Sequence, residues 1–197
     1  VSCALNPIAG REDALKISRA EKVKKVFIAG GGPAGLEAAR VAALRGHDVH
    51  LYEKDTLGGQ LNLASVPPGK QEIRLLVDFE TEQITKLGVK VEYRELTPEL
   101  VREKRPDAVI VATGSHPKEA ELDMHKHRNV IAAVQVLKGN VPQGKIVVIG
   151  GRQTGAETAE FLAAKGKDVS LVEASNEISK DTGHQVFAHY FLLFSLE

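Results

Sequence analysis

The pattern VFIAGGGPAGLEAARVAALRGHDVHLYE, residues 26–53, occurs again as IVVIGGRQTGAETAEFLAAKGKDVSLVE, residues 146–173. The two stretches lie 120 residues apart, align without a gap and share 11 of 28 positions. Each contains an apolar run, a glycine-rich segment, a helical pattern and a second apolar run that ends in a glutamate. This order predicts a βαβ unit that binds a dinucleotide. Two such units in one chain indicate two dinucleotides that exchange electrons, usually a flavin and a nicotinamide.

Three glycines of the first unit meet distinct physical requirements. Gly30 permits the tight turn after the strand, Gly32 lets the backbone approach a pyrophosphate, and Gly35 permits close packing of helix and strand. Pro33 can begin the helix at no cost in hydrogen bonding, because the first N–H groups of a helix have no intrahelical partner. Those free N–H groups and the positive end of the helix dipole favour a phosphate there.

Each unit ends in an acid that is placed to contact a ribose. Glu53 follows Gly30 by 23 residues, where its carboxylate can accept hydrogen bonds from both ribose hydroxyls. Glu173 favours NADH over NADPH, because a 2′-phosphate would meet a carboxylate. Arg152 stands at the second glycine position of the second fingerprint, where its side chain would crowd a pyrophosphate, although a guanidinium could also pair with phosphate oxygens. The candidate residues of this second site are Gly150, Gly151, Arg152, Gln153, Thr154, Gly155 and Glu173.

The composition is that of an ordinary globular protein. Of 197 residues, 43% are hydrophobic and 26% charged, and 26 lysines and arginines balance 26 aspartates and glutamates. This balance gives no electrostatic case for a nucleic acid or a membrane surface as a partner. The longest apolar stretch, Val186–Leu196, is too short to span a bilayer. One cysteine excludes an intramolecular disulfide and favours a reducing, cytoplasmic compartment.

Periodicity predicts further elements outside the repeat. Helical spacing predicts helices at Glu72–Leu87, Pro98–Lys104 and Ala132–Leu137. A strand is predicted at Val89–Tyr93, a buried strand at Ala108–Ala112, and a Gly- and Pro-rich loop at Leu57–Gly69. Only 24 residues follow Glu173, whereas a complete nicotinamide domain needs about 40 to 60 more for a third strand and its crossover. The second domain is therefore expected to be truncated.

The order of these motifs resembles that of two-dinucleotide-binding flavoproteins. The segments GGGPAG, LGGQLN, VPPGK and VIVATGSHP come before the second glycine-rich unit, and CALNPIAGRE (Cys3–Glu12) comes before them all. This order is similar to that in the C-terminal part of NADH:flavin oxidoreductases of the 2,4-dienoyl-CoA reductase, 2-enoate reductase and trimethylamine dehydrogenase group. In that group a Cys-x-x-Asn-Pro segment follows an FMN-binding barrel. Its cysteine, matched here by Cys3, is the last ligand of a [4Fe–4S] cluster in the full-length protein.

The resemblance implies an α/β fold with three parts. Residues 1–21 would be an arm or linker, residues 22–117 a Rossmann-like FAD-binding domain with a parallel sheet, and residues 118–197 a partial Rossmann-like NAD(P)-binding domain. By this resemblance, the first turn would contact the FAD pyrophosphate and Glu53 the ribose. Two further segments would lie along the FAD and close over it. The implied FAD-site residues are Gly30, Gly32, Pro33, Ala34, Gly35, Glu53, Lys54, Gly58, Gly59, Gln60, Ala112, Thr113 and Gly114.

The resemblance also implies an activity. Such proteins pass a hydride from NADH to FAD, then electrons through the cluster to FMN, which reduces an activated C=C bond or works in reverse from an amine. No catalytic residue is assigned in this chain, because the FMN barrel, three cluster cysteines and a closing Gly-Asp motif are missing from it. The barrel of the parent protein is therefore the expected partner, and the parent could be a homo-oligomer.

Two alternatives remain at this point. The first site could hold ADP in place of FAD, as the resemblance to trimethylamine dehydrogenase-like proteins allows, and the chain would then be a non-catalytic nucleotide-binding module. A small reductase resembling thioredoxin reductase is disfavoured, because the chain has no Cys-x-x-Cys.

Overall fold

The computed structural model describes residue 3 and residues 6–116 and 127–180. The chain divides into two compact units, one made of residues 1–62 and 72–116 and the other of residues 63–71 and 117–197. None of the helices within the described ranges is both long enough and apolar enough to cross a membrane. Each unit contains one copy of the repeated stretch.

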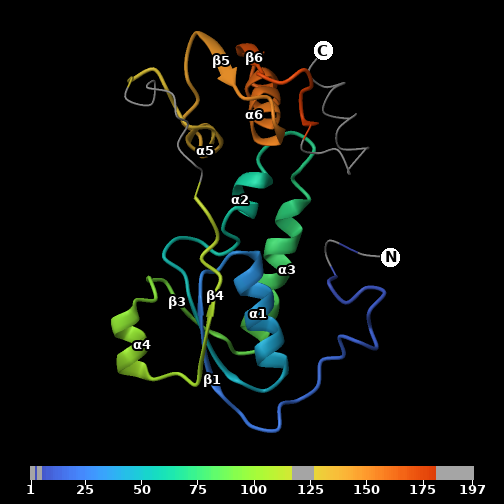
Figure 1. Ribbon diagram of the computed structural model, residues 1–197, viewed down its shortest axis with the longest axis vertical. Helices are drawn as coiled ribbons and strands as arrows, with labels where there is room; N and C mark the ends of the chain where they lie inside the picture. The colour runs from blue at the N-terminus through green and yellow to red at the C-terminus, as the bar shows by residue number, and fades with distance from the viewer. Residues whose placement is uncertain (1–2, 4–5, 117–126, 181–197) are drawn as a thin grey trace. The chain divides into compact units, whose positions relative to one another are not determined.

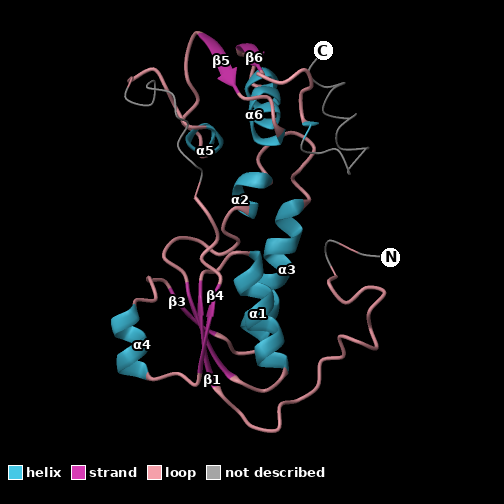
Figure 2. Cartoon of the chain, viewed as in Figure 1, coloured by secondary structure: helices cyan, strands magenta, loops and turns pink. Residues whose placement is uncertain are grey.

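The first unit is built on a parallel sheet of four strands in the order β3-β2-β1-β4 (Figures 1 and 2). The helix α1 connects β1 to β2, α3 precedes β3, and α4 connects β3 to β4. This order, with the first strand between the second and the fourth, is that of half of a doubly wound dinucleotide-binding domain. The elements are β1 (Lys25–Ala29), α1 (Pro33–Leu44), β2 (Asp48–Tyr52), α3 (Ile73–Lys86), β3 (Lys90–Glu92), α4 (Pro98–Lys104) and β4 (Ala108–Val111). The short helix α2 (Leu61–Ala64) spans the point in the sequence where the first unit ends and the second begins.

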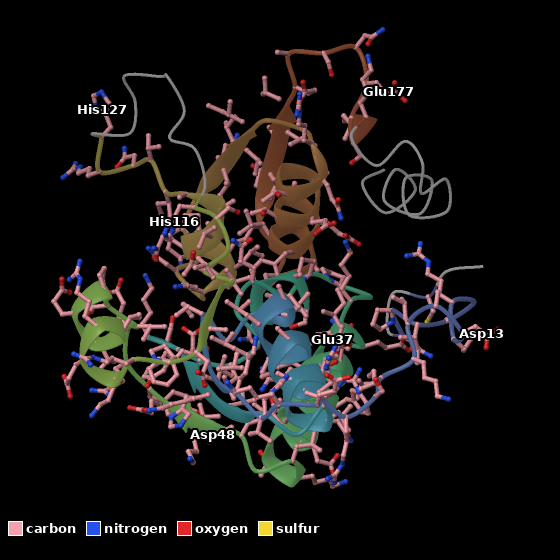
Figure 3. The ribbon with its side chains drawn as sticks, turned by 60° about the horizontal axis from the view of Figure 1, so that its bottom comes forward. Asp13, Glu37, Asp48, His116, His127 and Glu177 are labelled. Carbon is pink, nitrogen blue, oxygen red and sulfur yellow. The ribbon has the colours of Figure 1, made fainter. Side chains whose placement is uncertain are left out.

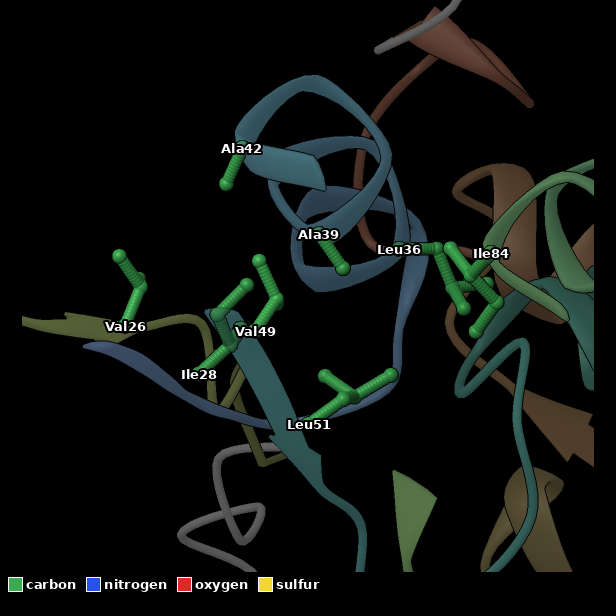
Figure 4. Packing of buried hydrophobic residues seen from close by; sticks show 8 residues of the cluster. All are labelled: Val26, Ile28, Leu36, Ala39, Ala42, Val49, Leu51 and Ile84. Carbon is green, nitrogen blue, oxygen red and sulfur yellow. The ribbon is translucent and has the colours of Figure 1, made fainter. Parts of the chain in front are cut away.

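The two faces of this sheet carry different side chains, because successive residues of a strand point to opposite sides. One face packs against α1 and α3 and forms the main core, whose residues are Val26, Ile28, Leu36, Ala39, Ala42, Val49, Leu51 and Ile84 (Figure 4). On the other face Phe27, which is 1% exposed, lies between the rings of His50 and Tyr52 at centroid distances of 5.1 and 5.0 Å. The central strand β1 is therefore covered on both sides, as its continuous apolar run predicts.

Two sequence predictions in this unit were wrong in detail. The run at Ala108–Ala112 was expected to be a buried strand, but β4 is an edge strand and Val111 is 75% exposed. An edge strand has a neighbour on one side only, so a continuous apolar run does not ensure burial. The segment Leu57–Gly69 was expected to be a loop throughout, but it contains the short helix α2.

The second unit contains the other copy of the repeat, β5 (Lys145–Ile149), α6 (Gln153–Ala164) and β6 (Asp168–Val172), together with α5 (Ala133–Leu137). Among the described residues, its sheet has two parallel strands. Its core gathers Val136, Phe161 and Leu162, and Val66 from the segment 63–71 packs against them. One face of β5 is exposed: Val147 and Ile149, which alternate with less exposed residues, are 60% and 58% exposed.

Candidate dinucleotide-binding site

In the turn after β1, two positions can hold only glycine because a side chain would clash with the backbone of the protein. Gly30 has a φ of +103°, and a Cβ there would lie 2.3 Å from the carbonyl oxygen of Ala112, at the end of β4. A Cβ at Gly35 would lie 1.8 Å from the carbonyl oxygen of Gly30, so the first turn of α1 sits directly on the turn. The Gly30 N–H donates to the Tyr52 carbonyl at 2.8 Å and joins the turn to the end of β2. Both positions would clash with any other residue.

Gly32 is different, because nothing in the protein requires a glycine there. Its φ of −73° is accessible to any residue, and a Cβ would have no heavy atom within 4 Å. It is the N-cap of α1, and no side chain caps this end of the helix. Pro33 is the first residue of the helix, as predicted. The space beside Gly32 is therefore open, and the uncapped N–H groups of α1 lie next to it.

Glu53 lies directly after β2 and contacts the glycine-rich turn. Its Oε2 accepts a hydrogen bond from the Gly31 N–H at 2.6 Å, and its Oε1 accepts one from the Asp55 N–H at 2.8 Å. Lys54, the next residue, is exposed. A carboxylate has about four acceptor sites, so two remain on Glu53 for a ligand.

The remaining predicted residues of the first site gather around the same turn. The Gly58 N–H donates to the Gly31 carbonyl at 2.8 Å, and a Cβ at Gly59 would lie 3.0 Å from the Cα of Gly32. The Gln60 side chain donates from Nε2 to the Ser115 carbonyl at 2.8 Å, which ties this segment to the one that follows β4. That following segment contains Ala112, Thr113 and Gly114, and Ala112 covers Gly30. The turn, the residues after β2, the Gly58–Gln60 segment and the residues after β4 thus converge at the carboxyl ends of the strands, with Pro33 and Ala34 at the start of α1.

The second unit repeats the turn with one substitution. Gly150 has a φ of +97°, and a Cβ at Gly155 would lie 1.7 Å from the Gly150 carbonyl oxygen. Arg152 occupies the N-cap of α6 with φ −69° and ψ 177°, close to the φ −73° and ψ −178° of Gly32. The arginine side chain is exposed. Gln153 and Thr154 then begin the helix, and the backbone has accommodated the arginine without a change of shape.

Glu173 repeats the contacts of Glu53. Its Oε2 accepts from the Gly151 N–H at 2.5 Å and its Oε1 from the Ser175 N–H at 2.8 Å. These hydrogen bonds, the one from Ser175 first, lower the pKa of Glu173 below its ordinary value, because they stabilise the ionised form.

The two turns differ in what covers them. Gly30 is closed by the backbone of Ala112 and Thr113, whereas a Cβ at Gly150 would meet nothing within 4 Å. In the described part of the second unit no strand takes the place that β4 has beside β1. The first turn is thus enclosed by tertiary structure, and the second is formed by its own βαβ unit.

A partly buried charged cluster, which the sequence reasoning missed, joins α1 to α3. Glu37 projects from α1 (Figure 3) and accepts hydrogen bonds from Arg40 at 2.6 and 2.8 Å. Glu80 of α3 is 6% exposed, and its Oε2 lies 3.8 Å from Arg40 Nε without a hydrogen-bond partner. Burial raises the pKa of Glu80, and the neighbouring Glu37 raises it further. The signal in the sequence was an acid three residues after Val77 and four before Ile84, on the apolar face of the helix.

In the second unit, the glutamate that corresponds to Glu37 has a different partner. Glu157 is buried and forms an ion pair with Lys70 of the VPPGK segment. The repeat showed that Glu157 corresponds to Glu37, but nothing in the sequence indicated that Lys70 would be its partner.

A metal site is not formed by the part of the chain that the structure describes. No group of three or more His, Cys, Asp or Glu side chains in that part is placed to hold an ion. Cys3 is exposed and forms no disulfide.

Comparison with known proteins identifies the family. The family described as pyridine nucleotide-disulphide oxidoreductase matches residues 24–190, and the chain belongs to it. The chain is 44% identical over 189 residues to bilirubin reductase of Mediterraneibacter gnavus, covering 94% of this chain and 30% of the relative. It is 41% identical over 200 residues to cinnamate reductase of Clostridium sporogenes, covering 100% of this chain and 30% of the relative.

A solved structure supports the same relationship. The complex of 2-naphthoyl-CoA reductase with 2-naphthoyl-CoA matches with a TM-score of 0.90 and 35% identity, over 99% of this chain and 30% of that one. The predicted α/β fold and the resemblance to two-dinucleotide-binding flavoproteins are confirmed. The chain spans 30% of the length of each of these relatives.

Proposed function

We propose that this member of the family is the FAD- and NADH-binding portion of a larger flavin-dependent oxidoreductase and the place where electrons enter it. The observation that carries the proposal is the open space beside Gly32. The fold would accept a side chain there, yet the position holds glycine; it is the uncapped start of α1, lies beside Gly59 and follows Gly31, which Glu53 holds. A bound group that needs the closest approach of the backbone explains this arrangement.

The residues around the first turn fit an adenine dinucleotide. The N–H groups at Gly32, Ala34 and Gly35 would hold the pyrophosphate, and the free acceptor sites of Glu53 would bind the ribose hydroxyls. Lys54 and Gly58–Gln60 would lie along the FAD, and Ala112–Gly114 would close over it. A bound flavin would supply the capacity to take up a hydride and pass on electrons. The residues of this chain would bind the cofactor and orient it.

The second turn would take the nicotinamide nucleotide. Glu173 carries a negative charge where a 2′-phosphate would lie, which favours NADH over NADPH. The exposed Arg152 stands where Gly32 leaves open space, so close approach of a pyrophosphate is hindered. We therefore propose weak NADH binding by this chain, and Arg152→Gly alone would not make it tight, because the described part of the turn lacks a covering strand.

The activity of the whole protein is proposed from its relatives. Bilirubin reductase and cinnamate reductase are both named as reductases, which is consistent with reduction of an activated C=C bond in the longer protein. That reaction would need an FMN-binding barrel and a [4Fe–4S] cluster, of which Cys3 would be one ligand. Both would belong to the longer protein, with a cytoplasmic location.

The test is FAD binding by Gly32→Arg, which places in the first turn the residue that the second turn already accommodates. We expect an unchanged circular dichroism spectrum and a FAD affinity at least about tenfold lower, a loss of about 1.4 kcal/mol, because the side chain fills the pyrophosphate space. Fluorescence titration with FAD measures the affinity, and Arg152→Gly serves as the matched control that leaves the first site untouched. FAD affinity equal to that of the parent would refute the assignment. Binding of ADP without FAD would support the nucleotide-binding module instead.

A further inference from the structure

Gly31 and Gly151, which follow the first glycine of each turn, are held by the same pair of contacts. Gly31 donates its N–H to Glu53 Oε2 at 2.6 Å, and its carbonyl accepts from the Gly58 N–H at 2.8 Å. Gly151 donates its N–H to Glu173 Oε2 at 2.5 Å, and its carbonyl accepts from the Ser179 N–H at 2.7 Å. Both backbone polar groups of this glycine are therefore fixed in each unit, and these two hydrogen bonds are called the clamp.

From this repetition we propose that Glu53 and Glu173 are positioning residues, which hold Gly31 and Gly151 and set the turn's shape before a nucleotide binds. This role comes in addition to the ribose contact proposed above. Hydrogen bonds from a backbone N–H to an ionised carboxylate are among the short and strong ones in proteins. The turn would thus be organised by the acid at the neighbouring strand end.

The packing explains why positions 31 and 151 are glycine. A Cβ at Gly31 would lie 2.6 Å from Leu57 Cδ2 and 3.1 Å from Glu53 Cβ. A Cβ at Gly151 would lie 2.9 Å from Glu173 Cβ. In both units the glutamate stem thus lies against the glycine, and a side chain there would displace the carboxylate from the N–H. The glycine serves the glutamate contact as well as the ligand.

The glutamate contact occurs in both units, although different residues complete the clamp. The carbonyl of Gly31 is held by Gly58, from the loop that precedes α2, and that of Gly151 by Ser179, which follows β6. The carboxylate and the glycine, by contrast, are identical in the two units. The constant part of the clamp is therefore the glutamate.

Each carboxylate can hold the turn and still bind a ribose. Two N–H groups occupy about two of the four acceptor sites of Glu53, and two sites remain for hydroxyl groups. A nucleotide would not have to break the clamp in order to bind. The turn would already have its final shape when the nucleotide arrives, which lowers the cost of ordering it.

The first test needs no nucleotide. Amide hydrogen exchange is measured by NMR on the whole chain, in the parent and in Glu53→Ala and Glu173→Ala. We expect the Gly31 amide to exchange at least about tenfold faster in Glu53→Ala, with Gly151 unchanged, and the reverse in Glu173→Ala. Each variant is thus the matched control of the other, and the amides of α1 and α6 report whether a unit has unfolded. Unchanged exchange at Gly31 and Gly151 would overturn the proposal, and so would faster exchange that spreads equally through the helices.

The second test separates positioning from the ribose contact, which rests on the proposed function. The affinities of ADP and 2′,3′-dideoxy-ADP are compared in the parent and in Glu53→Ala. If the carboxylate acts through the turn, the variant weakens the dideoxy nucleotide as well, by about fivefold or more. If it acts only on the ribose, parent and variant bind the dideoxy nucleotide equally, and the positioning role is wrong. A parent that binds neither nucleotide would refute the proposed function, and the exchange result would then decide the positioning role by itself.

Discussion

The two βαβ units have the same turn but very different surroundings. In both, the first glycine (Gly30 or Gly150) has a positive φ, and the glycine five residues later lies against its carbonyl. A glutamate holds the N–H of the residue that follows the first glycine, Gly31 or Gly151. Yet β1 lies between two strands and is buried along its length, whereas β5 has one neighbour among the described residues and exposes Val147 and Ile149. The difference shows that a single βαβ unit forms the turn by itself. Its enclosure depends on a strand from far along the chain.

The sharpest way to test this comparison is to add one methyl group to the first glycine of each turn. Gly150→Ala should cost about 1–2 kcal/mol, because alanine resists a positive φ. Gly30→Ala should cost at least about 3 kcal/mol, because the methyl group also meets the Ala112 carbonyl oxygen, 2.3 Å away. Hydrogen exchange of the α1 and α6 amides, followed by mass spectrometry, measures the stability of each unit separately.

The helix ends provide the control for this pair. Gly46 and Gly166 both have positive φ values, +88° and +72°, and neither has a neighbour within 4 Å of a Cβ. Alanine at either one should cost about the same, on the order of 1 kcal/mol. Equal costs at Gly30 and Gly150 would show that β4 does not constrain the first turn.

A smaller effect is expected at the glutamate that occupies the same position in both helices, Glu37 in α1 and Glu157 in α6. In the second unit, Lys70→Met removes the cation from the buried Glu157 and should destabilise the unit by about 2 kcal/mol. Adding Glu157→Gln should recover most of that loss, because a neutral amide has a lower cost of burial than an unpaired carboxylate. Urea denaturation of the single and double variants measures both. A double variant that is no more stable than Lys70→Met would show that the lysine contributes by packing.

The smallest expected effect concerns pH and the first unit alone. Burial, then Glu37, raise the pKa of Glu80, and Arg40 opposes them. A carboxyl with a raised folded-state pKa gives stability that is complete below its unfolded pKa and is lost as the pH rises through the folded value. Glu80→Gln should abolish this loss and raise the stability by about 1 kcal/mol at pH 8 relative to the parent, with less gain at pH 4.

The measurement is the free energy of unfolding of parent and Glu80→Gln across this pH range. Glu37 and Arg40 are the charged groups that face Glu80 from α1, so Arg40→Gln should enlarge the pH dependence in the parent background. A difference between parent and Glu80→Gln that does not vary with pH would contradict the assignment.

Much of the fold could be read from the sequence, because its elements are local. The helices at Pro33–Leu44 and Pro98–Lys104 begin at a proline, and the helix at Ile73–Lys86 follows a clear apolar period. The glycine positions of both turns were equally readable, because positive φ and close helix packing have few solutions besides glycine. The 120-residue repeat then gave the second unit from the first.

The repeated pattern was sufficient to predict two βαβ units, the glycine positions of their turns and the acid at the end of each second strand. The folded structure set what encloses each turn. It placed Ala112 over Gly30, turned the apolar run at Ala108–Val111 into an exposed edge, and paired Glu157 with Lys70. It also turned the Glu53 and Glu173 carboxylates onto backbone N–H groups of their own turns. The physical reason is range: backbone dihedrals and helix periods are fixed by neighbours in sequence, whereas burial and ion pairing depend on segments that meet only in the folded chain.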